Sequence, residues 1–272
     1  MSTFTAFKRM FKGVSLDVED LYLLESFQIG YLPGWAPERE FAALLWAYPS
    51  IKRFLLAKNP ALADYVARIL AQFEPVGNPQ ELAACADTLL WTIADLLVYN
   101  KCPEAYDSQA FHEWDFAELT TITPLAGKTV VDGGAGTGRV TLEAAQTARH
   151  VFAIEPVTRL RQFIRDKAAA AGLDNVFVID GFNHRIPLPR HFADVLVTSH
   201  ALGWNLEEEL KEFERVVKPG GFIIHCPGTA EVTHEEPLHS RLVSPDWGYA
   251  FARYREADGW KRKYWKRREA VS

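Results

Sequence analysis

The feature that most constrains the fold is an alternation of two sequence patterns that begins at Lys128. From there, short β-branched runs alternate with longer stretches in which apolar residues recur at helical spacing. Five runs predict strands: TVVD, HVFAIE, NVFVID, ADVLVTS and GFIIHC. Such alternation is typical of parallel strands joined by crossover helices, and the terminal segments GYAFARYRE and WKRKYWKRR predict a hairpin. The sequence therefore predicts an α/β fold whose sheet has five parallel strands and a closing hairpin, seven strands in all.

The first hundred residues follow a different pattern, with helical periodicity and no convincing strand. Asn59 before Pro60, and Asn78 before Pro79, are the cap and first-turn residues that begin helices, and another helix is expected to start near Pro37. Apolar residues recur about every 3.6 positions after Asn78 and Pro79: Leu82, Ala86, Leu89, Leu90, Ile93 and Leu97. We expect an all-helical lobe over residues 1–105 and a second domain over residues 106–272.

The first predicted strand ends at Asp132 and runs directly into the glycine-rich segment 133–138, after which a helix begins. Glycines permit a sharp turn and a close approach of a ligand to the backbone, and the carboxyl end of a parallel strand is where such ligands bind. The dinucleotide fingerprint G-x-G-x-x-G fails, because Arg139 stands where its third glycine belongs. The Gly-Lys-Ser/Thr of a phosphate-binding Walker loop is absent as well. Phosphate-cradling loops are therefore disfavoured.

The residues Asp132, Gly134, Gly136, Thr137 and Gly138 form the pattern D-x-G-x-G-T-G. This pattern resembles motif I of the class I S-adenosylmethionine-dependent methyltransferases. Further matches follow in the family's order: an acid at the end of the second strand, an acid at the end of the third, and VVKPGGFII at the turn into the fifth. The resemblance covers about residues 105–272. It implies a Rossmann-like methyltransferase sheet, S-adenosylmethionine as cofactor and S-adenosylhomocysteine as product.

The resemblance also implies which residues hold the cofactor. Glu155 is expected to accept the two ribose hydroxyls and Asp180 to lie near the adenine amino group, while Asp132 faces the ammonium side. Carboxylates suit a diol and a cation better than phosphate-binding nests do. Gly133 departs from the family, which usually has a bulkier apolar residue there. The expected cofactor-binding residues are Asp132, Gly133, Gly134, Ala135, Gly136, Gly138, Glu155, Pro156, Asp180, Gly181, Phe182 and Ser199.

On the acceptor side, methyl transfer is an in-line displacement that depends on proximity in a dry site. A general base helps when the acceptor carries a proton, and His200, just past the fourth strand, is the candidate, with His184 and His225 as weaker ones. Four aromatic or imidazole residues are candidates for a cofactor lid or substrate pocket, or alternatively for packing between elements: Tyr106, His112, Trp114 and Trp204. Asp115, in the same segment as Tyr106, His112 and Trp114, is a further candidate for the lid or pocket.

Several functions are disfavoured by the sequence. The segment after the fourth strand, Thr198 to Ala201, lacks the Asn/Asp-Pro-Pro-aromatic motif of DNA amino-methylating enzymes, so DNA is not an expected partner. No cluster has metal-ligand spacing, so no metal is expected. Three cysteines without CxxC spacing fit a reducing compartment, and no apolar run reaches the roughly 20 residues of a membrane span. We expect a cytoplasmic protein with no membrane partner.

Three functions remain open. The first is methylation of a small-molecule acceptor, with the helical lobe 1–105 capping the pocket and selecting the substrate. The second is a module that binds S-adenosylmethionine without catalysis. The third is an RNA methyltransferase, because the last 20 residues carry eight Lys and Arg against three acidic residues although the net charge is −5. An RNA partner is less expected, because the basic residues alternate with aromatics as in a strand pair at a sheet edge. The acceptor molecule, the acceptor atom and the oligomeric state are left open.

Overall fold

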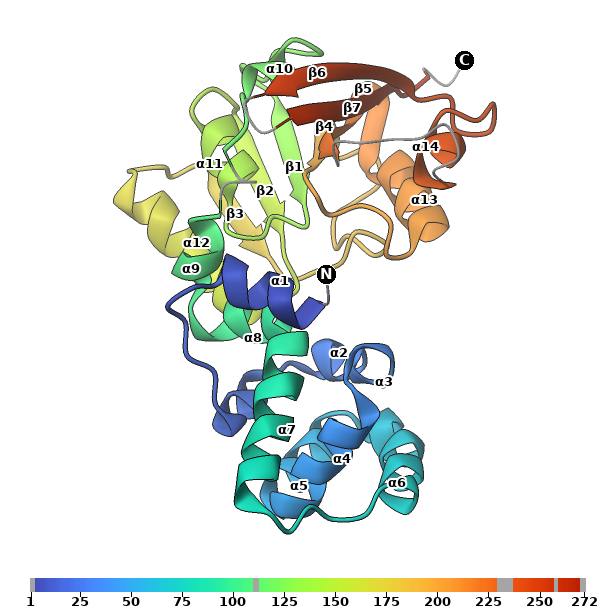
Figure 1. The fold of residues 1–272 in the computed structure, drawn as a ribbon. Helices are drawn as coiled ribbons and strands as arrows, with labels where there is room; N and C mark the ends of the chain where they lie inside the picture. Colours follow the sequence, from blue (N-terminus) through green and yellow to red (C-terminus); the bar gives the residue numbers. More distant parts are fainter. Residues whose placement is uncertain (1–2, 110–112, 229–236, 257–258, 270–272) are drawn as a thin grey trace. The chain divides into compact units, whose positions relative to one another are not determined.

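The computed structural model of the 272-residue chain describes all residues except 1–2, 110–112, 229–236, 257–258 and 270–272. The chain forms two compact units, Met1–Gln109 and Ala110–Ser272 (Figure 1). The first unit is helical and the second contains the sheet.

The described part of the first unit is built from short helices around one apolar core. They are α1 Thr3–Met10, α2 Ser26–Ile29, α3 Leu32–Trp35, α4 Glu38–Ala47, α5 Pro49–Lys58, α6 Ala63–Gln72, α7 Pro79–Thr92, α8 Ala94–Lys101 and α9 Pro103–Asp107, with 3-10 helices at Val18–Leu23 and Pro60–Leu62. The two predicted helix starts are confirmed. Asn78 Oδ1 accepts the N–H groups of Gln80 and Glu81 at 2.8 and 3.3 Å, and Asn59 Oδ1 accepts that of Ala61 at 3.2 Å.

The apolar stripe that begins at Pro79 was expected to continue to Leu97 in one helix, but the helix ends at Thr92 and turns by 78° into α8. The Thr92 hydroxyl donates to the carbonyl oxygen of Thr88 at 2.7 Å, a bond that bends helices, and Ile93 leaves the helical conformation. In the described ranges no single helix is long and apolar enough to cross a membrane. The pair α7 and α8 reaches that length and composition only when the two are joined across their bend.

The second unit contains a seven-stranded sheet in the order β3-β2-β1-β4-β5-β7-β6. The strands are β1 Thr129–Gly133, β2 His150–Ile154, β3 Val176–Ile179, β4 Ala193–Thr198, β5 Val217–Gly228, β6 Ala250–Glu256 and β7 Gly259–Arg267. Strands β1 to β5 are parallel, while β7 pairs antiparallel with both β5 and β6. The predicted sheet, with its closing hairpin, is confirmed.

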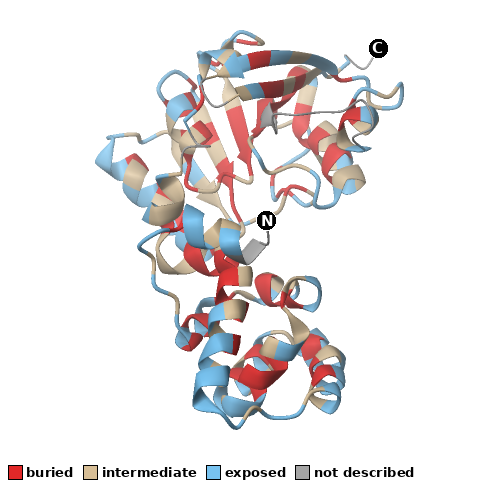
Figure 2. Ribbon diagram, in the orientation of Figure 1, coloured by how far each residue is buried: buried red, intermediate tan, exposed pale blue. Residues whose placement is uncertain are grey.

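Helices pack on both faces of this sheet, and their described members are α10 Ala117–Thr120, α11 Arg139–Ala145, α12 Thr158–Ala170, α13 Leu206–Val216 and α14 Pro237–Leu242 (Figure 1). Side chains alternate between the faces along each strand. Val130 of β1 packs into a core that includes Val140 of α11, while its neighbour Val131 packs into a core that includes Phe213 of α13. The central strands are accordingly buried (Figure 2).

The order of the strands determines where a ligand binds. From β1 the chain proceeds to β2 and β3 on one side, and β4 then pairs with the other side of β1. In open α/β sheets, ligands bind at the carboxyl ends of the strands next to such a reversal. The glycine-rich segment 133–138 lies at that point, because its first residue, Gly133, is the last residue of β1.

Candidate cofactor site

The glycine-rich segment forms a tight loop between β1 and α11. Gly134, Gly136 and Gly138 have φ angles of 68°, 56° and 84°, in the left-handed region that favours glycine. The N–H groups of Gly134 and Ala135 both donate to the carbonyl oxygen of Ile154 in β2, at 2.9 and 3.0 Å. The loop is therefore fixed to the neighbouring strand, and a Cβ on Gly134 or Gly138 would meet Ala201 or Ile164 at 2.5 and 3.0 Å.

Glu155 follows β2 and braces this loop. One carboxylate oxygen accepts the N–H of Gly136 at 2.8 Å and the other accepts the N–H of Val157 at 2.9 Å. The residue is only 4% exposed, and this burial raises the pKa of its carboxyl to about 7. Each carboxylate oxygen has a second lone pair, so the group can accept two more hydrogen bonds. These free acceptor positions fit the two donor hydroxyls of a ribose diol.

Asp132, the predicted partner of the ammonium side, is buried at the end of β1. Its carboxylate accepts the hydroxyl of Thr141 in α11 at 2.6 Å, and burial raises its pKa to about 6. This bond ties the strand end to the helix that follows the loop. A direct contact of Asp132 with the cofactor stays a prediction.

The ends of β2 and β3 are joined by an arginine that the sequence analysis missed. Arg161 donates through Nη1 to the carbonyl oxygens of Glu155 and Pro156 at 2.8 and 2.7 Å, and it lies 3.1 Å from the carboxylate of Asp180. The Asp180 side chain is exposed, as a group that meets the adenine edge would be. Beyond it, Gly181 leaves room for Pro187, whose Cδ would lie 2.7 Å from an added Cβ. The sequence does not single out Arg161, because its contacts with the ends of β2 and β3 are formed only in the folded sheet.

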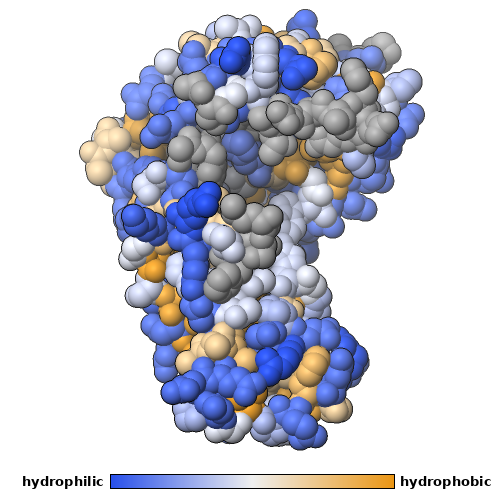
Figure 3. All heavy atoms as spheres, viewed as in Figure 1, coloured by the Kyte–Doolittle hydropathy of each residue, from blue (hydrophilic) through white to orange (hydrophobic). Residues whose placement is uncertain are grey.

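The segment after β4 carries the predicted acceptor-side residues. His200 is exposed and has a φ of 54°, a conformation that is strained for a residue with a side chain. Ser199, directly before it, is partly buried. Trp204 is 57% exposed, among the most exposed large apolar side chains of the described residues. The face of the molecule seen in Figure 3 is mainly hydrophilic, with small hydrophobic areas scattered over it.

The start of α13 differs from the sequence prediction. Asn205 followed three residues later by Glu208 is the sequence pattern that predicts a capping box, but the Asn205 side chain makes no cap bond. Instead, the buried carboxylate of Glu209 accepts the N–H groups of Gly203 and Asn205 at 2.8 and 3.3 Å. The prediction was wrong by one position, because the turn at residues 203–205 points its N–H groups toward Glu209.

The two weaker histidine candidates occupy different environments. His225 is buried near the end of β5 and shares a 2.7 Å hydrogen bond with the hydroxyl of Thr198 in β4. Burial lowers its pKa to about 3, so its imidazole is neutral at physiological pH. His184 is partly buried, stacks on Phe182 with ring centroids 5.3 Å apart, and lies 3.3 Å from the Asn205 amide.

The candidate lid residues are spread over both units. Tyr106 belongs to the first unit and makes an edge-to-face contact with Tyr99 at 4.6 Å. Trp114 is 4% exposed and fills the second unit's core, and its carbonyl oxygen accepts Nη2 of Arg139 at 2.9 Å. The Asp115 carboxylate accepts the N–H of Ala117, the first residue of α10, at 2.8 Å. His112 lies outside the described residues.

Asn183 is a further residue that the sequence analysis missed. It is 9% exposed, and its amide nitrogen donates to the carbonyl oxygen of Ala201 at 2.8 Å. A Cβ added to Gly133 would lie only 2.5 Å from Oδ1 of Asn183. Asn183 fills the space that a side chain at residue 133 would need, which explains why a glycine stands there. The unusual glycine was the only feature of the sequence that could have pointed to Asn183.

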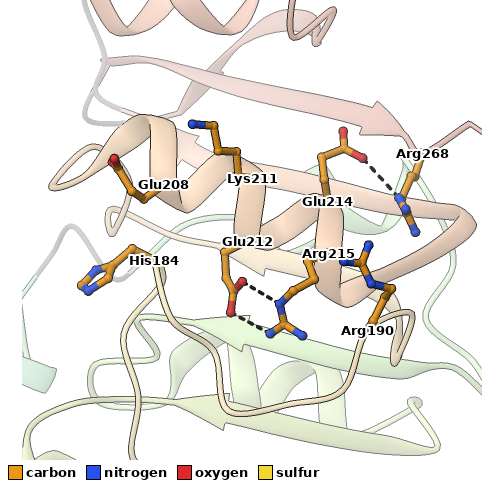
Figure 4. A pocket seen from close by; sticks show the side chains of 8 residues that line it. All are labelled: His184, Arg190, Glu208, Lys211, Glu212, Glu214, Arg215 and Arg268. Atoms are coloured by element: carbon orange, nitrogen blue, oxygen red, sulfur yellow. Dashed lines mark hydrogen bonds and ion pairs between the residues drawn. The ribbon is translucent and has the colours of Figure 1, made fainter.

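A separate charged pocket of about 440 Å³ lies along α13 (Figure 4). Its charges largely pair with each other: Glu212 bonds the guanidinium of Arg215 at 2.7 Å, and Arg268 lies 3.3 Å from Glu214. In the described part of the chain, no three or more His, Cys, Asp or Glu side chains are grouped to hold a metal ion.

Comparison with known proteins identifies the domain. Residues 131–225 match the model of a methyltransferase domain family. Over 132 residues the chain is 28% identical to an uncharacterized methyltransferase of Geobacillus sp. (strain WCH70), a match that covers 46% of this chain and 60% of that protein. An uncharacterized methyltransferase of Mycobacterium tuberculosis (strain ATCC 25618 / H37Rv) is 29% identical over 101 residues, 37% of this chain and 40% of the relative. The chain spans about 60% or less of the length of these curated relatives.

The fold has a counterpart among solved structures. The crystal structure of a SAM dependent methyltransferase from Aquifex aeolicus superimposes with a TM-score of 0.50 at 20% identity, covering 60% of this chain and 95% of that one. The sheet, the glycine loop and the family match together define a class I S-adenosylmethionine-dependent methyltransferase domain. The cofactor of this domain is S-adenosylmethionine.

Proposed function

We propose that this chain transfers the methyl group of S-adenosylmethionine to a small-molecule acceptor. The observation that carries the proposal is the Glu155 carboxylate, which braces the glycine loop with both oxygens and keeps lone pairs for a ribose diol. The loop lies beside the strand-order reversal, where a nucleoside is expected. We further propose that the helical unit, residues 1–109, selects the acceptor.

In this mechanism the cofactor supplies an activated methyl group on a cationic sulfonium. The chain's own residues supply binding, orientation and exclusion of water, which are what an in-line displacement requires. Glu155 would hold the ribose, and the turn that bears Ser199 and His200 would border the acceptor. His200 takes the proton of a hydroxyl or ammonium acceptor, because it is the exposed imidazole on that segment.

The RNA alternative receives less support, because most of the basic hairpin is engaged within the second unit. Lys263 and Lys266 pair with Glu118 and Glu214 at 2.7 Å each. Lys261 and Arg262 are only 7% and 1% exposed. A surface that binds phosphates needs exposed cations, which these side chains do not supply.

Calorimetric titration with S-adenosylmethionine and S-adenosylhomocysteine on the native chain and on Glu155→Ala tests the proposal. Removing the carboxylate leaves the diol poorly satisfied, so binding should weaken by about 1 to 3 kcal/mol. Unchanged affinity in the variant would contradict the assignment of Glu155. A screen of small-molecule acceptors with methyl-labelled cofactor then separates catalysis from binding alone, because a chain that binds tightly and methylates none of them is the non-catalytic module.

A further inference from the structure

Oδ1 of Asn183 is a buried oxygen with no hydrogen-bond partner among the described residues. The orientation of the amide is fixed, because Nδ2 donates to the carbonyl oxygen of Ala201 at 2.8 Å. A flipped amide would place two acceptor oxygens against each other. An acceptor buried without a partner is costly, so Oδ1 calls for a donor that the chain itself does not provide.

The position of the amide is set by two glycines. A Cβ on Gly133 would lie 2.5 Å from Oδ1, and one on Gly134 would lie 3.4 Å from Nδ2 and 2.5 Å from Cβ of Ala201. The amide therefore lies against the last residue of β1 and the first residue of the glycine loop. Gly133 pairs in register with Thr198 of β4, so this is the β1–β4 boundary where the strand order reverses.

The cofactor offers donors of three kinds: the ribose hydroxyls, the adenine amino group and the α-ammonium group. Glu155 lies on the β2 side of the loop and fits the hydroxyls. Asp180, exposed at the end of β3, fits the adenine edge. The α-ammonium group is the remaining kind of donor, and its three N–H bonds leave a donor for a second acceptor beside the predicted Asp132. Asn183 lies on the opposite, β4 side of β1.

We propose that Oδ1 of Asn183 accepts a hydrogen bond from the α-ammonium group of S-adenosylmethionine, while Nδ2 holds the segment after β4 through Ala201. This inference rests on the proposed function and adds to it a residue that binds the amino-acid end of the cofactor. It also explains why residue 133 is a glycine, since any larger residue would displace the Asn183 amide from the loop.

The test compares two ligands on two proteins by calorimetry. The ligands are S-adenosylhomocysteine and its deamino analogue, which keeps the carboxylate and lacks the ammonium group. The native chain should bind S-adenosylhomocysteine about 10- to 100-fold more tightly than the analogue, the range for a hydrogen bond to a charged group. Asn183→Leu should lose most of this preference by weakening only the ammonium-bearing ligand. Equal weakening of both ligands, or no weakening, would overturn the proposal.

A second variant reaches the same oxygen from the opposite side. Gly133→Ala places a methyl group 2.5 Å from Oδ1 and should lose the same preference, so the test survives if Asn183→Leu does not fold. Asn175→Leu is the matched control. Asn175 also donates its amide to backbone carbonyls, those of Ala145 and Ala148. It directly precedes β3, at the amino end of that strand, and therefore lies away from the carboxyl ends where the glycine loop is. This control should keep the native preference.

Failure of the two proposals can be told apart. If the native chain binds neither ligand, the proposed function fails and the inference about Asn183 fails with it. If the native chain binds S-adenosylhomocysteine and both variants keep the full preference over the analogue, the proposed function stands and Asn183 is not the ammonium partner.

Discussion

At the scale of single residues, the site depends on two buried carboxyl groups, those of Glu155 and Asp132. Glu155 accepts two backbone N–H groups and Asp132 accepts one hydroxyl, yet burial raises the pKa of both carboxyls. Desolvation therefore outweighs these bonds. The sequence predicted the positions of both acids, because strand ends are marked by local pattern. It did not predict their bracing role, which arises from contacts across the sheet.

The raised pKa of Glu155 predicts a pH-dependent stability. Burial raises the pKa of the Glu155 carboxyl from its ordinary value of 4.5 to about 7, so between these values the folded state retains a proton that the unfolded state has released. The free energy of unfolding should therefore fall as pH rises through this window. Glu155→Gln should show a shallower decline between about pH 4.5 and 7 in urea denaturation. The exposed Glu74→Gln is the control, and an unchanged slope in Glu155→Gln would contradict the prediction.

At the scale of elements, regular patterns were predictable and non-local contacts were not. The parallel strands, the hairpin and the helix starts at Asn59 and Asn78 follow from periodicity and capping chemistry, and the structure has them. The bend at Ile93 escaped prediction because a side-chain bond of Thr92 competes with the helix. Asn183 escaped because its partners, Gly133 and Ala201, are distant in sequence.

The cap at the start of α7 gives a test of the helical unit. Asn78→Ala removes the acceptor for the N–H groups of Gln80 and Glu81, and should lower the free energy of unfolding by about 1 kcal/mol. Asn78→Asp keeps a capping oxygen and should stay close to the native value. Thermal or urea denaturation measures both variants. A loss of equal size in Asn78→Asp would show that the cap bond is not the cause.

At the scale of the whole molecule, charge is unevenly distributed along the sequence but largely compensated in the fold. The chain has a net charge of −5, with its basic residues concentrated in the last 20 positions. There Lys263 and Lys266 pair with acidic side chains, and Arg268 donates to the carbonyl oxygen of Val217 at 2.6 Å. Arg253 and Arg255 are exposed beside the ring of Trp260. The basic segment thus forms the hairpin at one edge of the sheet, and most of its charges are used in contacts within the second unit.

This compensation predicts weak binding of RNA. Fluorescence anisotropy with a labelled single-stranded RNA should give a dissociation constant well above about 1 µM, with a shallow salt dependence set by few phosphate contacts. Replacing Arg253 and Arg255 by alanine should remove most of what binding there is. Submicromolar affinity with a steep salt slope would instead favour an RNA acceptor.

The central claim is that Glu155, beside the glycine loop, receives the ribose of S-adenosylmethionine. A crystal structure of the chain with S-adenosylhomocysteine tests it most directly. We predict that both ribose hydroxyls lie within hydrogen-bond distance of the Glu155 carboxylate, with the nucleoside over the loop of residues 133–138. A nucleoside bound elsewhere, or a ribose that does not contact Glu155, would contradict the account.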